Sequence, residues 1–246
     1  MAAGGSGNQR TERRAAVPSR ARRAPSWRAD SLFSRALEPE SGWDDARDAV
    51  YANQRARMLD AMSRAVASKG YARVSVADVV DLAGVSRRTF YEQFTDKEHC
   101  FLVAYETGTE ALLNEMVARA AAVDGVDWHG RLHAALHAYT GILAGEPEFA
   151  RAALIDVLGA GPRAVELRRQ VYERFVEQYR ALSALAAHEE FQGRPVPELY
   201  LRALVGGIGE LVGLHVLAHG ARSLPEITPD LVALVTAVFT GARRGA

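Results

Sequence analysis

The polar residues with the clearest arrangement lie between positions 75 and 98, in the stretch SVADVVDLAGVSRRTFYEQFTDKE. Two short segments of helical periodicity flank Gly84-Val85-Ser86, a pattern typical of two short helices joined by a tight turn. Arg87 and Arg88 open the second segment, where an arginine side chain can pair with both O6 and N7 of a guanine. This stretch therefore predicts a helix-turn-helix unit whose second helix enters the major groove of DNA.

Other side chains around this unit suit contacts with the DNA backbone. Thr89 and Tyr91 carry hydroxyl groups that can donate to phosphate oxygens. Lys97 lies in the first turn of the next predicted helix, where free backbone N–H groups also favour an anion. We expect apolar residues to lock the two helices together and onto the helix before them. These residues are Val79, Leu82, Val85, Phe90 and Phe94.

The stretch AGVSRRTFYEQFTDKE resembles the signature of TetR-type repressors, in which Gly-Val, a polar helix start, Thr, an apolar residue, Tyr, Phe and Lys follow in this order. The similarity extends upstream through the predicted first helix and residues 70–75. It implies an all-α protein of about nine helices. In such a protein an N-terminal DNA-binding domain precedes a helical ligand-binding domain, which dimerises through its last two helices.

The resemblance also implies roles for individual residues. By this resemblance, the residues expected to contact phosphates are Ser75, Ser86, Thr89, Tyr91 and Lys97. The residues expected to face the major groove are Arg87, Arg88 and Gln93. Ala77 departs from the pattern, because the family often has a polar or basic residue at this position.

Beyond the unit, apolar residues keep helical spacing to the end of the chain, and Gly/Pro pairs separate the segments. This pattern predicts helices at 128–144, 147–158, 162–189, 196–220 and 228–243. We divide the chain into a disordered, Arg-rich tail (1–45), a helix-turn-helix domain (46–97), and a ligand-binding and dimerisation domain (98–246).

The charge distribution, the cysteine content and the length of apolar runs indicate a partner and a cellular compartment for the protein. The 30 basic and 30 acidic residues cancel, but residues 46–97 hold nine Arg and Lys against six Asp and Glu, which favours an anionic partner such as double-stranded DNA. The only cysteine, Cys100, fits a reduced cytoplasm and is interpreted as a small core residue. Since no run of about 18 apolar residues is present, we expect no membrane span.

The last two predicted helices are the candidate dimer interface. VGGIGELVGLHVLAHG has four glycines in its interior, Gly206, Gly207, Gly209 and Gly213, each of which costs about 0.5–1 kcal/mol in a helix, so a close approach of two helices is the expected reason. The interface residues predicted on these helices are Leu199, Ala203, Gly206, Gly207, Leu214, Leu231, Leu234, Val235 and Val238. The alternative is that these residues form an intramolecular core.

The middle helices are the candidate ligand site, because the resemblance implies an apolar pocket there that takes a small organic effector. The predicted lining residues are Trp128, His133, His137, Tyr139, Phe149, Tyr172, Phe175 and Tyr179. His129, His133 and His137 also follow at i, i+4 and i+8, which raises a metal site as the alternative. No cysteine or carboxylate cluster accompanies them, so we expect neither a metal nor a cofactor.

These patterns together predict a dimeric DNA-binding repressor that a small, largely apolar ligand releases from a palindromic operator. The alternative is a regulator of the same fold that activates transcription, or that responds to a protein partner or a metal ion. An enzyme is not expected, because the sequence holds no phosphate loop, nucleophile elbow, HExxH motif or Cys–His arrangement.

Overall fold

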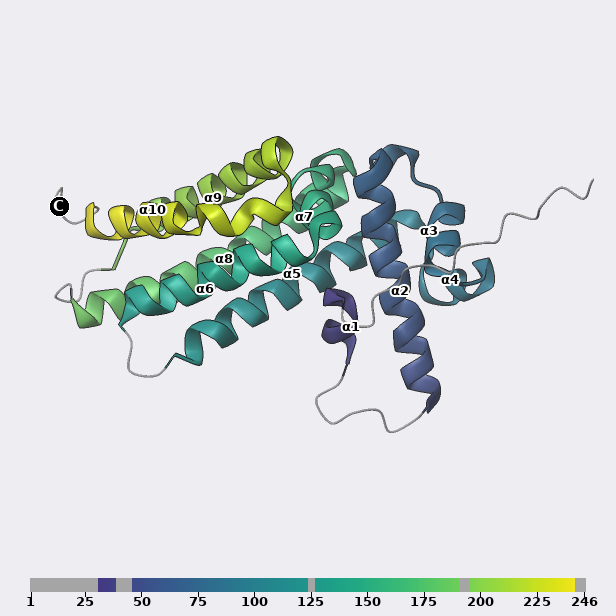
Figure 1. Ribbon diagram of the computed structural model, residues 1–246, viewed down its shortest axis with the longest axis horizontal. Helices are drawn as coiled ribbons and strands as arrows, with labels where there is room; N and C mark the ends of the chain where they lie inside the picture. The colour runs from purple at the N-terminus through teal and green to yellow at the C-terminus, as the bar shows by residue number, and fades with distance from the viewer. Residues whose placement is uncertain (1–30, 39–45, 124–126, 191–194, 242–246) are drawn as a thin grey trace, which may run out of the picture.

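The computed structural model describes residues 31–38, 46–123, 127–190 and 195–241. Within these ranges the protein has ten α-helices, three 3-10 helices and no strand. The all-α prediction is therefore confirmed. Figure 1 shows helices α2 (Ala46–Lys69), α3 (Val76–Ala83) and α4 (Arg87–Gln93) at one end of the molecule. The C-terminal helices α9 (Glu198–His219) and α10 (Thr228–Gly241) extend toward the other end.

The N-terminal domain consists of α2 (Ala46–Lys69), the 3-10 helix η1 (Tyr71–Arg73), α3 (Val76–Ala83) and α4 (Arg87–Gln93). Its core is made by fully buried apolar residues of α2 and by two aromatic rings at α4. These residues are Met58, Leu59, Met62, Val66, Phe90 and Phe94. The predicted locking residue Val79 is also fully buried, whereas Leu82 and Val85 are half-buried against the same core.

Local signals start and stop the two short helices as predicted. Ser75 caps α3 through a capping box, in which its side chain accepts from the Asp78 N–H and the Asp78 carboxylate accepts from the Ser75 N–H. Gly84 ends α3 at φ 63°, in the left-handed region that favours glycine. Ser86 then caps α4 by accepting from the Thr89 N–H at 3.0 Å.

The C-terminal domain contains α5 (Lys97–Ala121), α6 (Trp128–Gly145), α7 (Pro147–Leu154), η2 (Asp156–Gly159), α8 (Pro162–Glu189), α9 (Glu198–His219), η3 (Ala221–Ile227) and α10 (Thr228–Gly241). The long helix α5 joins the domains, because it packs against α2 and also against α6 and α8. The predicted helix 147–158 is shorter than expected, since α7 ends at Leu154 and a 3-10 turn follows.

The prediction of a disordered tail over residues 1–45 is wrong for one segment, because Leu32–Leu37 form a helix, α1. Leu32 and Phe33 are buried, and the N–H of Leu32 donates to the Oε1 of Glu146 at 2.8 Å. Helix α1 thus packs on α2 and α5. Six residues are too few to show helical periodicity, and their burial depends on partners far along the chain. The disorder predicted for residues 1–30 and 39–45 lies outside the described residues.

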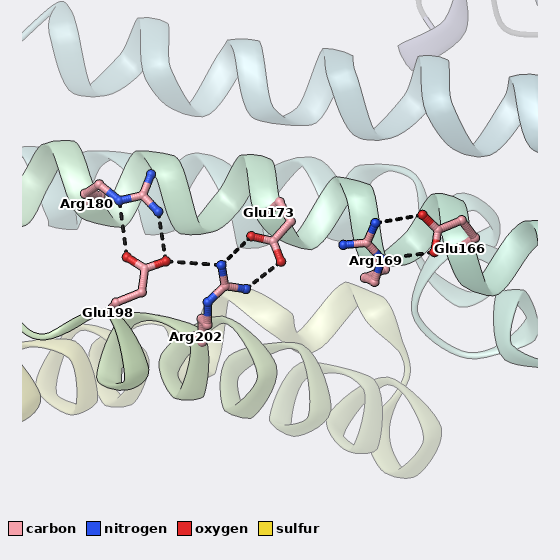
Figure 2. A network of polar contacts seen from close by, with 6 residues as sticks. All are labelled: Glu166, Arg169, Glu173, Arg180, Glu198 and Arg202. Carbon is pink, nitrogen blue, oxygen red and sulfur yellow. Dashed lines mark hydrogen bonds and ion pairs between the residues drawn. The ribbon is translucent and has the colours of Figure 1, made fainter.

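Ion pairs hold α8 and α9 side by side along their exposed edge (Figure 2). The Arg180 guanidinium contacts the Glu198 carboxylate at 2.8 Å, and Arg202 contacts Glu173 at 2.5 Å. Because these side chains are exposed and screened by solvent, the pairs add little to stability and chiefly fix the alignment of the two helices.

We expected no stretch long and apolar enough to span a membrane, but the two C-terminal segments meet that description. Glu198–His219, and Ala221–Gly241 with η3 included, are long and apolar enough by length and composition to cross a membrane. Core helices of soluble proteins can have the same length and composition. Helix α9 also carries apolar residues that the protomer leaves exposed, such as Leu199 and Leu214.

Candidate functional site

Helix α4 presents its arginines and Tyr91 outward, whereas Phe90 and the capping residue Phe94 point inward. Phe90 and Phe94 are buried with ring centroids 5.4 Å apart, and Arg55 of α2 lies over the Phe94 ring. Arg87 and Arg88 are exposed, and the Tyr91 side chain is 57% exposed. The helix therefore offers two guanidinium groups and a phenol hydroxyl from a rigid base, which suits contact with the edges of bases and with phosphates.

The predicted phosphate ligands Ser75, Ser86 and Thr89 all lie at helix starts. Ser86 Oγ and Thr89 Oγ1 are 2.8 Å apart, and Ser75 Oγ donates to the Asp78 carboxylate at 2.6 Å. Ser75 and Ser86 are exposed, and Thr89 is half-buried. Their hydroxyl groups therefore act as caps in the free protein and lie beside backbone N–H groups at the starts of α3 and α4.

The groove-facing position predicted for Gln93 is wrong. Its side chain is only 8% exposed, and its Nε2 donates to the Tyr51 carbonyl of α2 at 3.3 Å. Gln93 is the last residue of α4, six positions after Arg87, so it lies on a different face from the exposed arginines. It ties α4 to α2 instead.

Lys97 lies at the start of α5, as expected, but its ammonium group contacts the protein itself. Nζ donates to the carbonyl oxygens of Val74 at 3.0 Å and Tyr71 at 3.3 Å, and it lies 4.6 Å from the centre of the Tyr71 ring. This arrangement fastens α5 to η1, directly before the helix-turn-helix unit. A phosphate contact of Lys97 would have to add to these bonds or replace them.

A second lysine holds the start of α3. Lys69 Nζ lies 2.6 Å from the Asp78 carboxylate, which also accepts from the Ser75 hydroxyl and N–H. The hydrogen bonds from Lys69 and Ser75 hold the pKa of Asp78 well below its usual range. The capping carboxylate is therefore ionised at neutral pH.

The middle of the C-terminal domain encloses an apolar cavity of about 60 Å³, which we name the inner chamber. Five of the predicted ligand residues line it: Tyr139, Phe149, Tyr172, Phe175 and Tyr179. Burial raises the pKa of the Tyr139 and Tyr179 hydroxyls, so both are neutral donors and acceptors. The chamber can therefore hold an uncharged, largely apolar group.

Three predicted ligand residues lie elsewhere. Trp128 is buried, but it stacks on Phe239 of α10 at a centroid distance of 5.5 Å and forms part of the core. His133 and His137 are exposed, with their rings stacked 6.3 Å apart on the outer face of α6. The inner face of α6 is formed by Leu132 and Leu136, each one position before a predicted histidine. The prediction therefore chose a face of α6 that is rotated by one residue from the buried one.

Sequence reasoning missed the contribution of α5 to the chamber. Tyr105, Thr109, Leu112 and Met116 line it. Their spacing of i, i+4, i+7 and i+11 places them on one face of a helix, and this spacing could have identified them as lining residues from the sequence.

Histidines do not converge on a metal site in the described part of the chain. No group of three or more His, Cys, Asp or Glu side chains is close enough there to hold an ion. His215 instead shares a hydrogen bond of 2.8 Å with the Ser223 hydroxyl.

The candidate dimer surface divides between the two last helices. On α9, Leu199 is 76% exposed and Leu214 is 53% exposed, and Ala203 is exposed as well. Gly206 and Gly207 are half-buried, and a Cβ at either would meet no atom of the protomer within 4 Å. The protomer itself therefore gives no steric reason for these two glycines.

The predicted interface residues of α10 need correction. Leu231 and Val235 are buried within the protomer, so for these two the intramolecular core is the correct alternative. Leu234 and Val238 are half-buried and pack partly against the protomer's core, while Ala233 on the outer side of the helix is exposed. Gly209 is explained within the protomer, because a Cβ there would collide with the Tyr172 hydroxyl, whereas one at Gly213 would make only an ordinary contact with Leu154.

Comparison with known proteins points to one family. Residues 58–104 match the family model described as bacterial regulatory proteins, tetR family. No curated protein matches the chain. These 47 matched residues span the core of α2, the helix-turn-helix unit and the start of α5.

Solved structures with a similar fold cover both domains. The transcriptional regulator FadR from Bacillus subtilis, in complex with stearoyl-CoA, is 15% identical with a TM-score of 0.65, over 74% of this chain and 97% of that chain. FadR from Bacillus halodurans, a fatty acid degradation regulator, is 15% identical with a TM-score of 0.66, over 77% and 96%. A TetR-family transcriptional regulator from Streptomyces coelicolor is 17% identical with a TM-score of 0.61, over 82% and 96%.

Proposed function

Because this chain belongs to the tetR family of bacterial regulatory proteins, a family of DNA-binding transcriptional regulators and not of enzymes, we propose that it is a dimeric repressor. In this proposal, a small and largely apolar ligand enters the C-terminal domain and releases the protein from a palindromic operator. The observation that carries the proposal is the exposed polar face of α4 held on a buried aromatic base.

The dimer is supported by the uncovered apolar side of α9. Leu199, Leu211, Leu214 and Leu217 are each at least 49% exposed in the protomer, and they alternate with small residues on the same helix. Small residues allow the backbones of two helices to approach closely. Pairing of this side of α9 and the outer side of α10 with a second copy would bury the surface and place two α4 helices on one side of the dimer.

The ligand is supported by the cavity and by its position. The inner chamber lies between α5, α6, α7, α8 and α9, and α5 continues from its wall to the helix-turn-helix unit. Filling the chamber can thus change the angle between the domains, provided that the ligand prefers one of two arrangements. That the B. subtilis FadR structure holds stearoyl-CoA shows that a similar fold can accommodate an acyl ligand.

The operator contact is tested by selecting binding sites from randomised duplex DNA and measuring their affinity by fluorescence anisotropy. Arg87→Ala should lose about 1–3 kcal/mol at the selected site and relax the preference for one base pair. Arg119→Ala is the matched control, because Arg119 is an exposed arginine of α5 paired with Glu115, away from α4. An equal loss by Arg87→Ala on unrelated DNA would remove the base-reading role.

The direction of regulation is tested separately. A reporter gene is placed behind the selected site, and expression is measured as the amount of protein rises. Falling expression supports repression, whereas rising expression supports the activator alternative.

A further inference from the structure

A second cavity adjoins the inner chamber on the side of the α5–α6 connection. This outer chamber has a volume of about 260 Å³ and lies between α5, α6 and α8. Four residues line both chambers: Met116, Leu136, Phe175 and Tyr179. These side chains form a partition between two halves of one apolar space.

The partition is built from side chains that can move. Met116 is unbranched and flexible, so its thioether can adopt another rotamer at little cost. Phe175 is half-buried and meets the Tyr139 ring edge to face at 6.3 Å, a contact that tolerates displacement. A slender hydrocarbon chain can therefore pass from the outer chamber into the inner one.

One positive charge lies on the wall of the outer chamber. Among the described residues that line it, Arg131 of α6 is the only charged one, and Gln178 adds an exposed amide at its edge. The Nε of Arg131 is buried and has no hydrogen-bond partner among the described residues. By contrast, Arg174 and Arg180 of α8 both pair with glutamates. Among the described residues the Arg131 guanidinium thus has no ion-pair or hydrogen-bond partner, and it lies in an otherwise apolar wall.

An available guanidinium group selects its ligand by shape and charge. Its planar fork of N–H donors matches a carboxylate, which it can bind through two parallel hydrogen bonds. A single cation balances one negative charge and leaves a doubly charged phosphate monoester or a coenzyme A group undercompensated. No described residue that lines the inner chamber is charged, and Arg168, which lies beside it, already donates to the Tyr172 hydroxyl. Burial raises the pKa of Tyr105, Tyr139 and Tyr179, so their hydroxyls are neutral.

We propose that the effector is an unesterified carboxylic acid with a hydrocarbon chain. Its carboxylate pairs with Arg131 in the outer chamber, and its chain passes Met116 and Phe175 into the inner chamber toward Phe149. This proposal rests on the proposed function, because it names the ligand of the same cavity. It goes beyond the proposed function by specifying that the ligand has a free anionic head group and that Arg131 binds this group.

The head group is tested by calorimetric titration of the full-length protein with decanoate, decan-1-ol and decanoyl-CoA. Decanoate should bind the wild-type protein, and Arg131→Gln should weaken it about tenfold or more, the factor expected for loss of a charge-assisted hydrogen bond. Decan-1-ol should bind both proteins equally. Arg119→Gln, which removes an exposed arginine outside the chamber wall, should leave decanoate binding unchanged.

The path of the chain is tested with a variant of the inner wall. Ala153 lines the inner chamber only, so Ala153→Leu shortens the space beyond the partition. It should weaken decanoate several-fold more than hexanoate, whose chain ends earlier. Circular dichroism melting of each variant verifies that the fold is retained.

The outcomes that overturn the proposal are distinct from those that overturn the proposed function. Equal decanoate affinity in wild type and Arg131→Gln, tight binding of decanoyl-CoA without binding of decanoate, or equal effects of Ala153→Leu on both acids would each overturn it. If decanoate binds through Arg131 but does not release DNA, the ligand assignment stands and ligand-induced release fails. Loss of DNA binding in Arg87→Ala is independent of all these results.

Discussion

The rings of Phe33 and Phe149 meet edge to face, with an interplanar angle of 90° and centroids 5.9 Å apart. Phe33 belongs to α1, which precedes the DNA-binding domain, and Phe149 belongs to α7 and lines the inner chamber. The Phe149 ring also lies so close to Gly108 of α5 that a Cβ there would collide with it. Helix α1 is therefore in direct contact with the wall of the cavity.

Replacing Phe33 with Ala should destabilise the protein, because it removes a buried ring and leaves a cavity between α1 and α7. We expect the free energy of unfolding to fall by about 3 kcal/mol, measured by urea denaturation. Ala36→Ser is the matched control, since Ala36 is an exposed residue of the same helix. Equal stability of the two variants would show that α1 does not pack on the C-terminal domain.

Adding a methyl group at Gly108 should push the Phe149 ring from its place. Gly108→Ala should cost about 1–3 kcal/mol of stability through overpacking, and it should also weaken binding of any ligand that reaches the inner chamber. Gly141→Ala provides the comparison, because a Cβ at Gly141 meets no atom within 4 Å on an exposed face of α6. That variant should gain about 0.5–1 kcal/mol from the lower entropy of the unfolded chain. A stabilising Gly108→Ala would contradict the close contact.

The dimer surface predicts opposite behaviour for two apolar residues. Leu214→Asp should leave the protomer folded and abolish the dimer, because a two-fold interface would bury two charges without partners. Val235→Asp should instead unfold the protomer, since Val235 is 0% exposed within it. Sedimentation velocity and thermal melting distinguish the two effects. A Leu214→Asp variant that sediments as the wild-type dimer would exclude this side of α9 from the interface.

Acid should weaken the start of α3 through Asp78. Its pKa is lowered in the folded protein from an ordinary value of 3.8, so the carboxylate stabilises the fold above about pH 4. This contribution is lost as the pH falls through the folded-state pKa. The wild type should therefore be more stable than Asp78→Asn at pH 7, and the difference in urea midpoint should shrink at pH 3. Asp81→Asn, at an exposed position of the same helix, should show no such trend.

Much of the DNA-binding domain could be predicted because its signals are local. The capping box of Ser75 and Asp78, the left-handed Gly84 and the Ser86 cap each involve residues at most four positions apart. Interactions of that range form in the same way whatever the rest of the chain does. The boundaries of the helices and the residues of the turn followed from them.

The cavity could be predicted only in part, because which residues line it depends on the rotation of each helix. Aromatic residues of α7 and α8 were correctly assigned, as their size favours burial on any helix. His133 and His137 were assigned to the wrong face of α6, while the polar residue that lines the outer chamber on that helix is Arg131. Neighbouring positions on a helix differ by about 100°, so periodicity identifies an apolar stripe but not its partner.

The sequence by itself determined the helix-turn-helix unit, with its caps and turn, and the order of the helices from α2 onward. Only the tertiary structure decided that Val235 packs inside the protomer while Leu214 remains exposed. It also decided that Leu32 finds its acceptor at Glu146, 114 positions away. Caps and turns are encoded by residues adjacent in the chain, whereas burial is set by surfaces that meet only when distant helices pack together.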